Sequence, residues 1–390
     1  MKNADLNYII KHFNLDERNV YSSNVKAGVN GTYIDFLHNS DINHRVTEVT
    51  PAIKTIEILT KNNTPMATIE NPIYPNNNHY GISIMKNKFT TENHLKKFGI
   101  RTTDSKIYTY NEMELAKQEF FKHNPERKAV IKPLNGSLSR GVYVNVSKDR
   151  FADNWNYSLA DRKNNKNAKV IVQEYLEGFE VRATILQGKL VSIIARVPSY
   201  VTGDGNHNIN ELIKIKNKNR KKCNYLRKHP ININNKHNEF LLSESRSIED
   251  IPDEGEHVLL SAVSNIINGG EIFNITDLVA DNIKDFALNT FLAAFPNMYS
   301  GGLDIMLKSF DDLTPYVLET NHFPVITLTK YPTFGKICEP EKILIESLIS
   351  QYQFTNESSE HYQINDEDKY IKDFINFSRR QVRMNDYIAK

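Results

Sequence analysis

The chain has 390 residues, of which 39% are hydrophobic and 25% charged, and its formal net charge is +2. This composition is ordinary for a soluble globular enzyme, and a nearly neutral chain has no overall field that would draw it to nucleic acid or to an anionic membrane. Cys223 and Cys338 are too few for a disulfide framework or a cysteine zinc site and fit a reducing cytosol, so we predict a cytoplasmic protein.

The first eighty residues mix short apolar stretches with polar breaks and end in the loop-like stretch NPIYPNNNHYG. They show no continuous apolar core of a signal peptide. Nowhere does an apolar run approach the roughly 18 residues that a membrane helix needs. We therefore expect a small N-terminal domain at 1–80, whose role the sequence does not reveal.

A helix is predicted at 88–100, KFTTENHLKKFGI, because Thr90 or Thr91 can cap it and Gly99 can end it. A short apolar strand follows at 128–134 and presents Lys132. Beyond it lies a loop of small residues that contains Gly136, Ser137, Ser139 and Gly141. Small residues let backbone N–H groups approach phosphates, and a lysine adds a point charge. The loop lacks the order of a Walker motif, and the alternative is an ordinary hairpin turn with a surface lysine.

After a second apolar strand at 169–176, the chain reads VQEYLEGFEVR over 172–182. Glu174, Tyr175 and Leu176 form a short linker whose backbone can read an adenine edge, and a carboxylate such as Glu180 can bind ribose hydroxyls. The alternative is a surface turn with an ion pair.

A hairpin is predicted at 180–199, with its turn at Gln187-Gly188. Arg182 and Arg196 lie on its two facing arms. Two arginines there can clamp a phosphate or a carboxylate, or they can pair with surface carboxylates, which is the commoner case.

The run KIKNKNRKKCNYLRKHP at 214–230 is strongly basic. It favours either a nucleic-acid-binding surface or a solvated basic helix, and the near-neutral net charge favours the solvated helix. A third interpretation is attraction of an acidic substrate.

An amphipathic helix is predicted at 281–295, followed by a second hairpin made of GGLDIMLKSF and TPYVLET. Glu319 and Asn321 share a face of its second strand because they are two residues apart, and Asp304 lies on the partner strand. Carboxylate and amide oxygens suit Mg²⁺, so these three residues are candidate metal ligands. Strands and helices in this order predict an α+β protein with antiparallel sheets.

These stretches occur in one order, and together they resemble the ATP-grasp superfamily, above all the ATP-grasp modules of cyanophycin synthetase and of bifunctional glutathione synthetase. The resemblance covers about residues 80–350, and its most specific stretch is SIEDIPDEGEHVLLSAVSNIINGGEIFNITDLV at 247–279. It implies an ATP-grasp fold, with two α+β subdomains that grip ATP between antiparallel sheets. The implied division is an N-terminal domain at 1–80, a central subdomain at 81–176, a C-terminal subdomain at 177–355 and a polar tail at 356–390.

The resemblance also implies a role for each candidate residue. The nucleotide phosphates would be contacted by Lys88, by Lys132 and by the loop that contains Gly136, Ser137 and Gly141. Adenine and ribose would be bound by Gln173, Glu174, Tyr175, Leu176 and Glu180. Arg182 and Arg196 would face the phosphates or an acyl phosphate. Asp304, Glu319 and Asn321 would hold Mg²⁺, for which Mn²⁺ is a possible substitute.

The chain departs from the family pattern at two places. Relatives usually read NxxPG after the metal carboxylate, whereas this chain reads NHFPVIT with Val325 in place of glycine, and it has Ser261 where they tend to carry an arginine. The first departure puts the acceptor substrate in doubt. The Mur-ligase-like domain of cyanophycin synthetase and the glutamate–cysteine ligase domain of the bifunctional enzyme are not in this sequence.

The implied reaction is an ADP-forming carboxylate–amine ligation through an acyl phosphate, with ATP and Mg²⁺ as cofactors and an amino acid or peptide as substrate. The alternatives are an ATP-grasp kinase that stops at phosphoryl transfer and a basic nucleic-acid-binding protein. We expect small-molecule or peptide partners, no nucleic acid and no membrane, and we leave a homodimer open.

Overall fold

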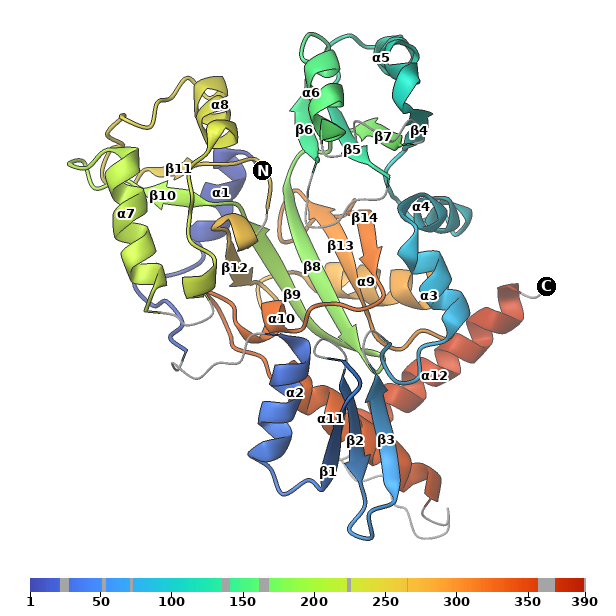
Figure 1. The fold of residues 1–390 in the computed structure, drawn as a ribbon. Coiled ribbons are helices and arrows are strands. Elements are labelled where there is room, and N and C mark those ends of the chain that lie inside the picture. Colours follow the sequence, from blue (N-terminus) through green and yellow to red (C-terminus); the bar gives the residue numbers. More distant parts are fainter. Residues whose placement is uncertain are drawn as a thin grey trace.

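The computed structural model describes residues 1–21, 28–50, 54–70, 73–134, 141–160, 168–222, 226–264, 266–356 and 369–388. Its centre is a five-stranded antiparallel sheet (Figure 1). The strands follow the spatial order β12 (Glu271–Asn274), β9 (Lys189–Val197), β8 (Phe179–Leu186), β13 (Gly301–Leu307) and β14 (Tyr316–Asn321).

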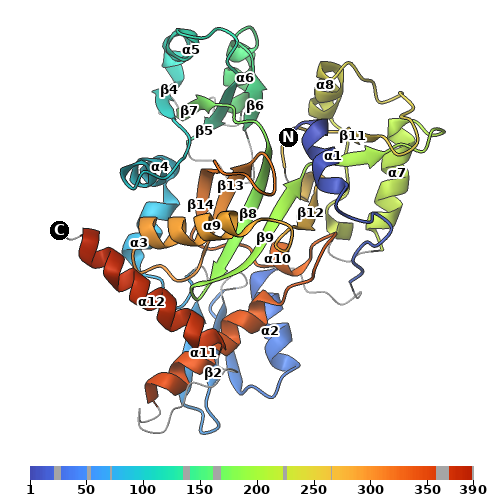
Figure 2. The ribbon, with the colours of Figure 1, turned by 180° about the vertical axis from the view of Figure 1, so that it is seen from behind.

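Alternation along β8 separates an apolar face of this sheet from a polar one. Phe179, Val181, Ala183 and Ile185 are fully buried in the largest hydrophobic cluster, while the residues between them point to the other face. Helix α9 (Asp281–Ala294) packs on the apolar face through Ile283, Ala287 and Phe291, which recur every fourth residue. Figure 2 shows α9 lying over this face of the sheet. The opposite face is thereby left for polar side chains.

A second sheet forms a separate lobe, which both views place at one end of the central sheet (Figures 1 and 2). Its strands follow the order β4 (Lys106–Thr109), β7 (Lys169–Glu174), β5 (Ala129–Pro133) and β6 (Tyr143–Val146). Helices α5 (Met113–Phe121) and α6 (Phe151–Ser158) cover one face, where Phe121 and Trp155 pack on Ile131, Val170 and Val172. The strands predicted at 128–134 and 169–176 are confirmed as β5 and β7.

The first eighty residues are distributed over two places. Helix α1 (Asn3–Ile10) packs in the core of the central sheet through Leu6, Ile9 and Ile10. The strands β1 (His44–Glu48), β2 (Lys54–Leu59) and β3 (Pro65–Glu70) form an antiparallel sheet that shares a core with α2 (Val29–His38) and with the distant α11 (Pro340–Asn356). The four-part division of the sequence stays a prediction.

Helices α3 (His79–Lys86) and α4 (Lys88–Lys97) pack beside β14. Helix α4 confirms the predicted helix, but the predicted capping residue is wrong. The side chain of Asn87 accepts hydrogen bonds from the backbone N–H groups of Phe89 and Thr90, so the helix begins earlier than Thr90 or Thr91 would allow.

A small unit at residues 200–259 combines the antiparallel pair β10 (Tyr200–Thr202) and β11 (His257–Leu259) with α7 (Ile209–Arg220) and α8 (Asn235–Ser243), which lie between these strands in sequence. Short 3-10 turns lie at Tyr110–Glu112, Leu226–Lys228 and Ile266–Asn268, and α10 (Thr327–Lys330) follows β14.

The predicted hairpin turn at Gln187-Gly188 is confirmed, and it contacts the C-terminal helix. Both turn residues have positive φ, at 50° and 79°, as a two-residue hairpin turn requires. Helix α12 (Lys369–Ile388) places the buried ring of Phe377 against Gly188, so that a Cβ there would lie 2.5 Å from the ring. Gln381 further anchors α12 by donating to the carbonyls of Phe295 and Met298. Position 188 therefore requires glycine for two reasons, the positive φ of the turn and the close approach of the Phe377 ring.

We therefore predict that Gly188→Ala destabilises the protein more than Gly99→Ala. Both glycines have positive φ, where a Cβ costs about 1–2 kcal/mol, but only Gly188 would also collide with a buried ring, which adds about 1–3 kcal/mol. Urea denaturation of the two variants measures the difference. Equal losses would show that α12 does not pack on this turn.

Candidate active site

The polar face of the central sheet brings the predicted metal ligands together. Asp304 of β13 pairs in register with Glu319 of β14, and Gly302 pairs with Asn321. The predicted pairing of these two strands is thus confirmed. Arg182 of β8 pairs with Asp304 from the other side. Three neighbouring strands therefore carry two carboxylates, an amide and a guanidinium on one face.

The Asp304 carboxylate is buried between the two predicted arginines. Arg182 forms a two-point ion pair with it, with Nη2 2.8 Å from Oδ2, and Arg196 Nη2 lies 2.9 Å from Oδ2. Burial disfavours ionisation, but the Arg182 and Arg196 guanidinium groups outweigh it and lower the pKa of Asp304 to about 2. Asp304 is therefore a carboxylate throughout the physiological pH range.

Arg196 also contacts Glu180, the predicted ribose ligand, and keeps an unused donor. Its Nη2 forms an ion pair with Glu180 across the β8–β9 hairpin. Its Nε is buried and has no hydrogen-bond partner among the described residues. A buried N–H without an acceptor is rare, and an anion on this face would satisfy it.

Glu319 is paired with the predicted phosphate ligand Lys88, whose Nζ lies 3.0 Å from its Oε2. Lys132, from the lobe, belongs to the same electrostatic neighbourhood. Burial of its ammonium group, aided by the positive charge of Lys88 and opposed by Glu319, lowers the pKa of Lys132 to about 8. The lobe and helix α4 thus present lysines to a common region.

The oxygen donors fit Mg²⁺, but they do not form a complete cage. In the described part of the chain, no three acidic, histidine or cysteine side chains gather into a metal cluster. Asp304, Glu319 and Asn321 supply oxygens only, which is the donor type that Mg²⁺ selects together with phosphate and water. The metal assignment of these residues stays a prediction.

The predicted adenine linker joins β7 to β8. Gln173 is buried at the end of β7, and Glu174 is exposed and pairs with Arg127. The Tyr175 N–H donates to the Lys128 carbonyl at 2.8 Å, so this backbone donor is already used. Burial raises the pKa of the Tyr175 hydroxyl to about 12. Leu176 is half-buried.

The glycine loop is described only at its end. Gly136 and Ser137 lie outside the described residues. Gly141 has a φ of 72°, and a Cβ on it would lie 2.5 Å from the Ser158 carbonyl oxygen. Glycine is therefore required where the loop enters β6, between the lobe's sheet and α6.

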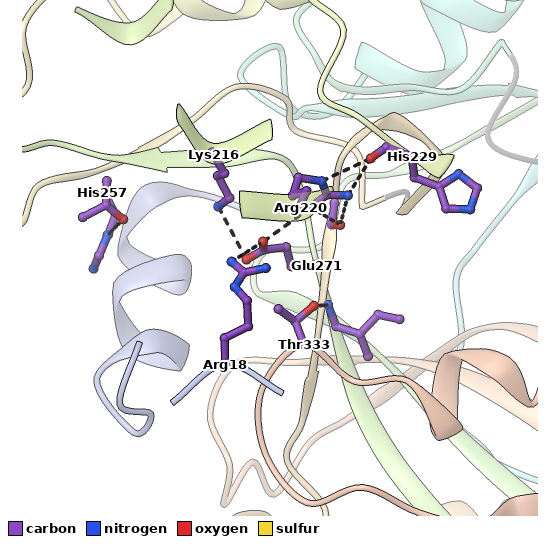
Figure 3. A network of polar contacts seen from close by, with 10 residues as sticks. Arg18, Lys216, Arg220, His229, His257, Glu271 and Thr333 are labelled. Atoms are coloured by element: carbon purple, nitrogen blue, oxygen red, sulfur yellow. Dashed lines mark hydrogen bonds and ion pairs between the residues drawn. The ribbon is translucent and has the colours of Figure 1, made fainter. Parts of the chain in front are cut away.

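Two basic residues of the 214–230 run are turned into the protein, so its interpretation as a solvated helix is wrong for them. Figure 3 shows Lys216 and Arg220 of α7 reaching the buried Glu271, which Arg18 also approaches from the N-terminal segment. Sequence alone could not pair a basic run with a carboxylate some fifty residues away.

Glu271 is the residue that the sequence interpretation missed. Burial disfavours its charge, but Lys216, Arg18 and Arg220 outweigh it and lower the pKa of Glu271 to about 2. Burial lowers the pKa of Lys216 to about 7. The available signal was a lone acidic residue at the start of the apolar stretch EIFNI, where a charge needs a partner.

Comparison with known proteins supports the resemblance. The chain is 28% identical over 265 residues to the glutathione biosynthesis bifunctional protein of Desulfotalea psychrophila, which covers 66% of this chain and 33% of that protein. It is 28% identical over 214 residues to the cyanophycin synthetase of Crocosphaera subtropica, which covers 53% of this chain and 24% of that protein. The chain thus spans about a third or less of the length of these relatives. No protein-family model matches it.

The fold is shared with a solved structure. The bifunctional glutathione synthetase of Pasteurella multocida superposes with a TM-score of 0.56 at 22% identity, covering 82% of this chain and 43% of that one. The predicted α+β ATP-grasp fold and the predicted resemblance to ATP-grasp ligases are confirmed. Among the described residues, no helix has both the length and the apolar character to cross a membrane.

We predict that Glu271→Ala strongly destabilises the protein. Removing this carboxylate leaves Arg18, Lys216 and Arg220 facing one another in a buried site, and breaking such a cluster costs about 3 kcal/mol or more. A matched control is Glu57→Ala, which removes the half-buried partner of the exposed Arg45 and should change stability little because water screens a surface pair. Thermal unfolding of both variants tests this, and similar small losses would contradict the role of Glu271.

Proposed function

We propose that this protein is an ADP-forming ligase that uses ATP to join a carboxylate to an amine, with an amino acid or a peptide as substrate. The observation that supports it best is the buried Asp304 between Arg182 and Arg196, opposite Glu319, on the polar face of an ATP-grasp sheet. The named activities of the relatives point the same way, although each relative is much longer than this chain.

In the proposed reaction, a substrate carboxylate oxygen forms a bond to the γ-phosphorus of ATP as the bond to ADP breaks. The amine nitrogen then bonds to the acyl carbon, phosphate leaves and the amine loses a proton. Arg182 and Arg196 are suited to hold the anionic acyl phosphate, since guanidinium groups bind such oxygens in a two-point manner. Arg196 Nε supplies a buried donor for this purpose.

Lys88 and Lys132 are proposed to bind the nucleotide phosphates, and Glu180 the ribose. Asp304, Glu319 and Asn321 are proposed to hold Mg²⁺, which when bound would supply positive charge to offset the charge that develops during phosphoryl transfer. Exclusion of water from the acyl phosphate would fall to the loop from Gly136 to Gly141. We further propose that the protein acts in the cytoplasm.

The substrates can be found by screening amino acids and dipeptides for phosphate release from ATP, with mass spectrometry of the products. Phosphate release that depends on both an acid and an amine, together with a product of the summed mass less water, supports a ligase. ATP turnover without any condensed product contradicts the proposal.

We predict that Glu319→Gln lowers ATP turnover about a hundredfold, because it removes a charged oxygen ligand while keeping the shape of the side chain. Turnover is measured over a range of Mg²⁺ concentrations, with circular dichroism to verify the fold. The matched control is Glu48→Gln, which changes an exposed carboxylate of the separate β1–β3 sheet and should keep normal turnover. If the Glu319 variant retains more than about a tenth of the turnover at saturating Mg²⁺, the metal assignment is wrong.

We also predict that ¹⁸O placed in the substrate carboxylate appears in the released phosphate. The attacking oxygen stays on phosphorus when the amine expels phosphate, so the transfer reports an acyl phosphate. A kinase that phosphorylates a hydroxyl, or a plain ATPase, transfers no label. Unlabelled phosphate under amide-forming conditions would therefore overturn the ligase mechanism while leaving ATP binding intact.

A further inference from the structure

The segment that follows β14 is held from outside the central sheet by the N-terminal part of the chain. Pro324 is buried, and its carbonyl oxygen accepts a hydrogen bond from the Tyr74 hydroxyl at 3.1 Å. The Phe323 ring lies against the Tyr74 ring, with their centroids 4.8 Å apart. Ile326 is buried in the hydrophobic cluster that α2, α11 and the β1–β3 sheet share. These contacts fix the turn directly after the predicted metal ligand Asn321.

The directions of the two tyrosine hydrogen bonds behind this turn are determined. A carbonyl oxygen can only accept, so Tyr74 must donate its single hydroxyl proton to Pro324. The Tyr33 hydroxyl, from α2, lies 3.2 Å from the Tyr74 hydroxyl and must therefore be the donor of that bond. Both side chains are fully buried, and burial raises the pKa of each hydroxyl, so both stay protonated. Tyr33 thus contacts Tyr74, and Tyr74 contacts the turn.

The turn in its place determines where the Asn321 side chain points. The Phe323 backbone N–H donates to Asn321 Oδ1 at 3.1 Å. A backbone N–H can only donate, so the atom that faces it is the amide oxygen and not the amide nitrogen. In the described part of the chain, this is the one hydrogen bond of the Asn321 side chain. The oxygen has a second lone pair, which is left for a cation on the face that Asn321 shares with Glu319.

The remainder of the segment is anchored independently of Tyr74. The Thr329 hydroxyl of α10 lies 3.0 Å from the Ser192 hydroxyl of the central sheet. Lys330, the last residue of α10, forms an ion pair with Glu341 of α11. Loss of the Tyr74 hydroxyl would therefore release the turn at 323–324 and leave α10 in place.

We propose that Tyr74 is a positioning residue that holds the Phe323–Pro324 turn, and with it the Asn321 amide oxygen, in the geometry that binds the metal. The inference rests on the proposed function, because it assumes that Asn321 is a ligand of Mg²⁺. Partners that orient a metal ligand strongly influence metal affinity although they do not touch the metal. The N-terminal part of the chain, whose role the sequence does not reveal, thereby takes part in the active site.

The affinity for Mn²⁺ in the presence of ADP tests the inference without a substrate or turnover, since free Mn²⁺ is measured by electron paramagnetic resonance. We expect Tyr74→Phe to weaken Mn²⁺ binding about three- to tenfold, because the buried Pro324 carbonyl loses its donor and the turn can shift. The matched control is Tyr33→Phe, which removes the same group one bond further away and leaves the Tyr74 proton on Pro324. This variant should keep the wild-type Mn²⁺ affinity within about twofold.

Urea denaturation of both variants separates positioning from a merely structural role. Each variant removes a buried hydrogen bond, so each should lose some stability. Only Tyr74→Phe should also lose Mn²⁺ affinity. Two variants that are less stable but bind Mn²⁺ as the wild type does would refute the positioning role.

A double-mutant cycle shows whether Tyr74 acts through Asn321. Asn321→Ala removes the proposed ligand, so Tyr74→Phe should cause no further loss of Mn²⁺ affinity beyond about twofold in that background. A loss as large as that of the single variant would show that Tyr74 acts by another route and would overturn the inference. If Tyr74→Phe does not fold, Phe323→Leu replaces it, because it removes the ring contact and keeps the backbone N–H that Asn321 accepts. It should weaken Mn²⁺ binding with the same dependence on Asn321.

The outcomes distinguish this inference from the ligase proposal. If Asn321→Ala weakens Mn²⁺ binding and Tyr74→Phe does not, the inference is refuted and the proposed function stands. If neither variant changes the affinity, the metal assignment of Asn321 is wrong and the inference fails with it. If the wild type binds no Mn²⁺ in the presence of ADP, the proposed function is refuted as well.

Discussion

The active face depends on one buried interaction, the clamp that Arg182 and Arg196 form on Asp304. A carboxylate buried this deeply would be unstable without cations at contact distance. The antiparallel sheet supplies Arg182 from the neighbouring strand β8 and Arg196 from β9, one strand further away. Gly302 completes the arrangement, because a Cβ there would lie 3.1 Å from Arg182 Cδ and 3.2 Å from Pro324 Cβ. The arginine stem can therefore lie flat on the sheet, with its charge delivered to Asp304.

A second buried cluster, around Glu271, connects three parts of the chain that belong to different structural elements. Arg18 comes from the N-terminal segment, Lys216 and Arg220 from the small α7–α8 unit, and Glu271 from the edge of the central sheet. Three cations meet one carboxylate, and the lowered pKa of Lys216 reflects that imbalance together with its burial. Since Glu271 is adjacent to the residue that pairs with Arg196, this cluster also fixes the strand that supports the active face.

Local patterns predicted much of this structure. Both hairpins, the Gln187-Gly188 turn and the pairing of Asp304 with Glu319 follow from period-two alternation and turn chemistry, which act over a few residues. The helix predicted at 88–100 follows from its end signals and is observed at Lys88–Lys97. The sequence could not show that α1 packs in the core of the central sheet, away from the segments that follow it in sequence. Nor could it show that the side chains of Lys216 and Arg220 point into the protein. Those outcomes depend on partners far along the chain, and a charge run has the same appearance whether it is solvated or paired.

In both sheets, alternation of side chains along the strands produces one apolar face that packs under helices and one polar face. In the lobe, one side of β5 and β7 packs under helices while the other presents Lys132 and Gln173. In the central sheet, one side of β8 packs on α9 while the other presents charged groups. Each sheet can bury one face only if the other remains polar. Burial is the main cause of the lowered pKa of Lys132, and the smaller contributions of Lys88 and Glu319 place these three charges within electrostatic range of one another. The lysines that the lobe and helix α4 contribute make the region between these polar faces suited to an anionic ligand.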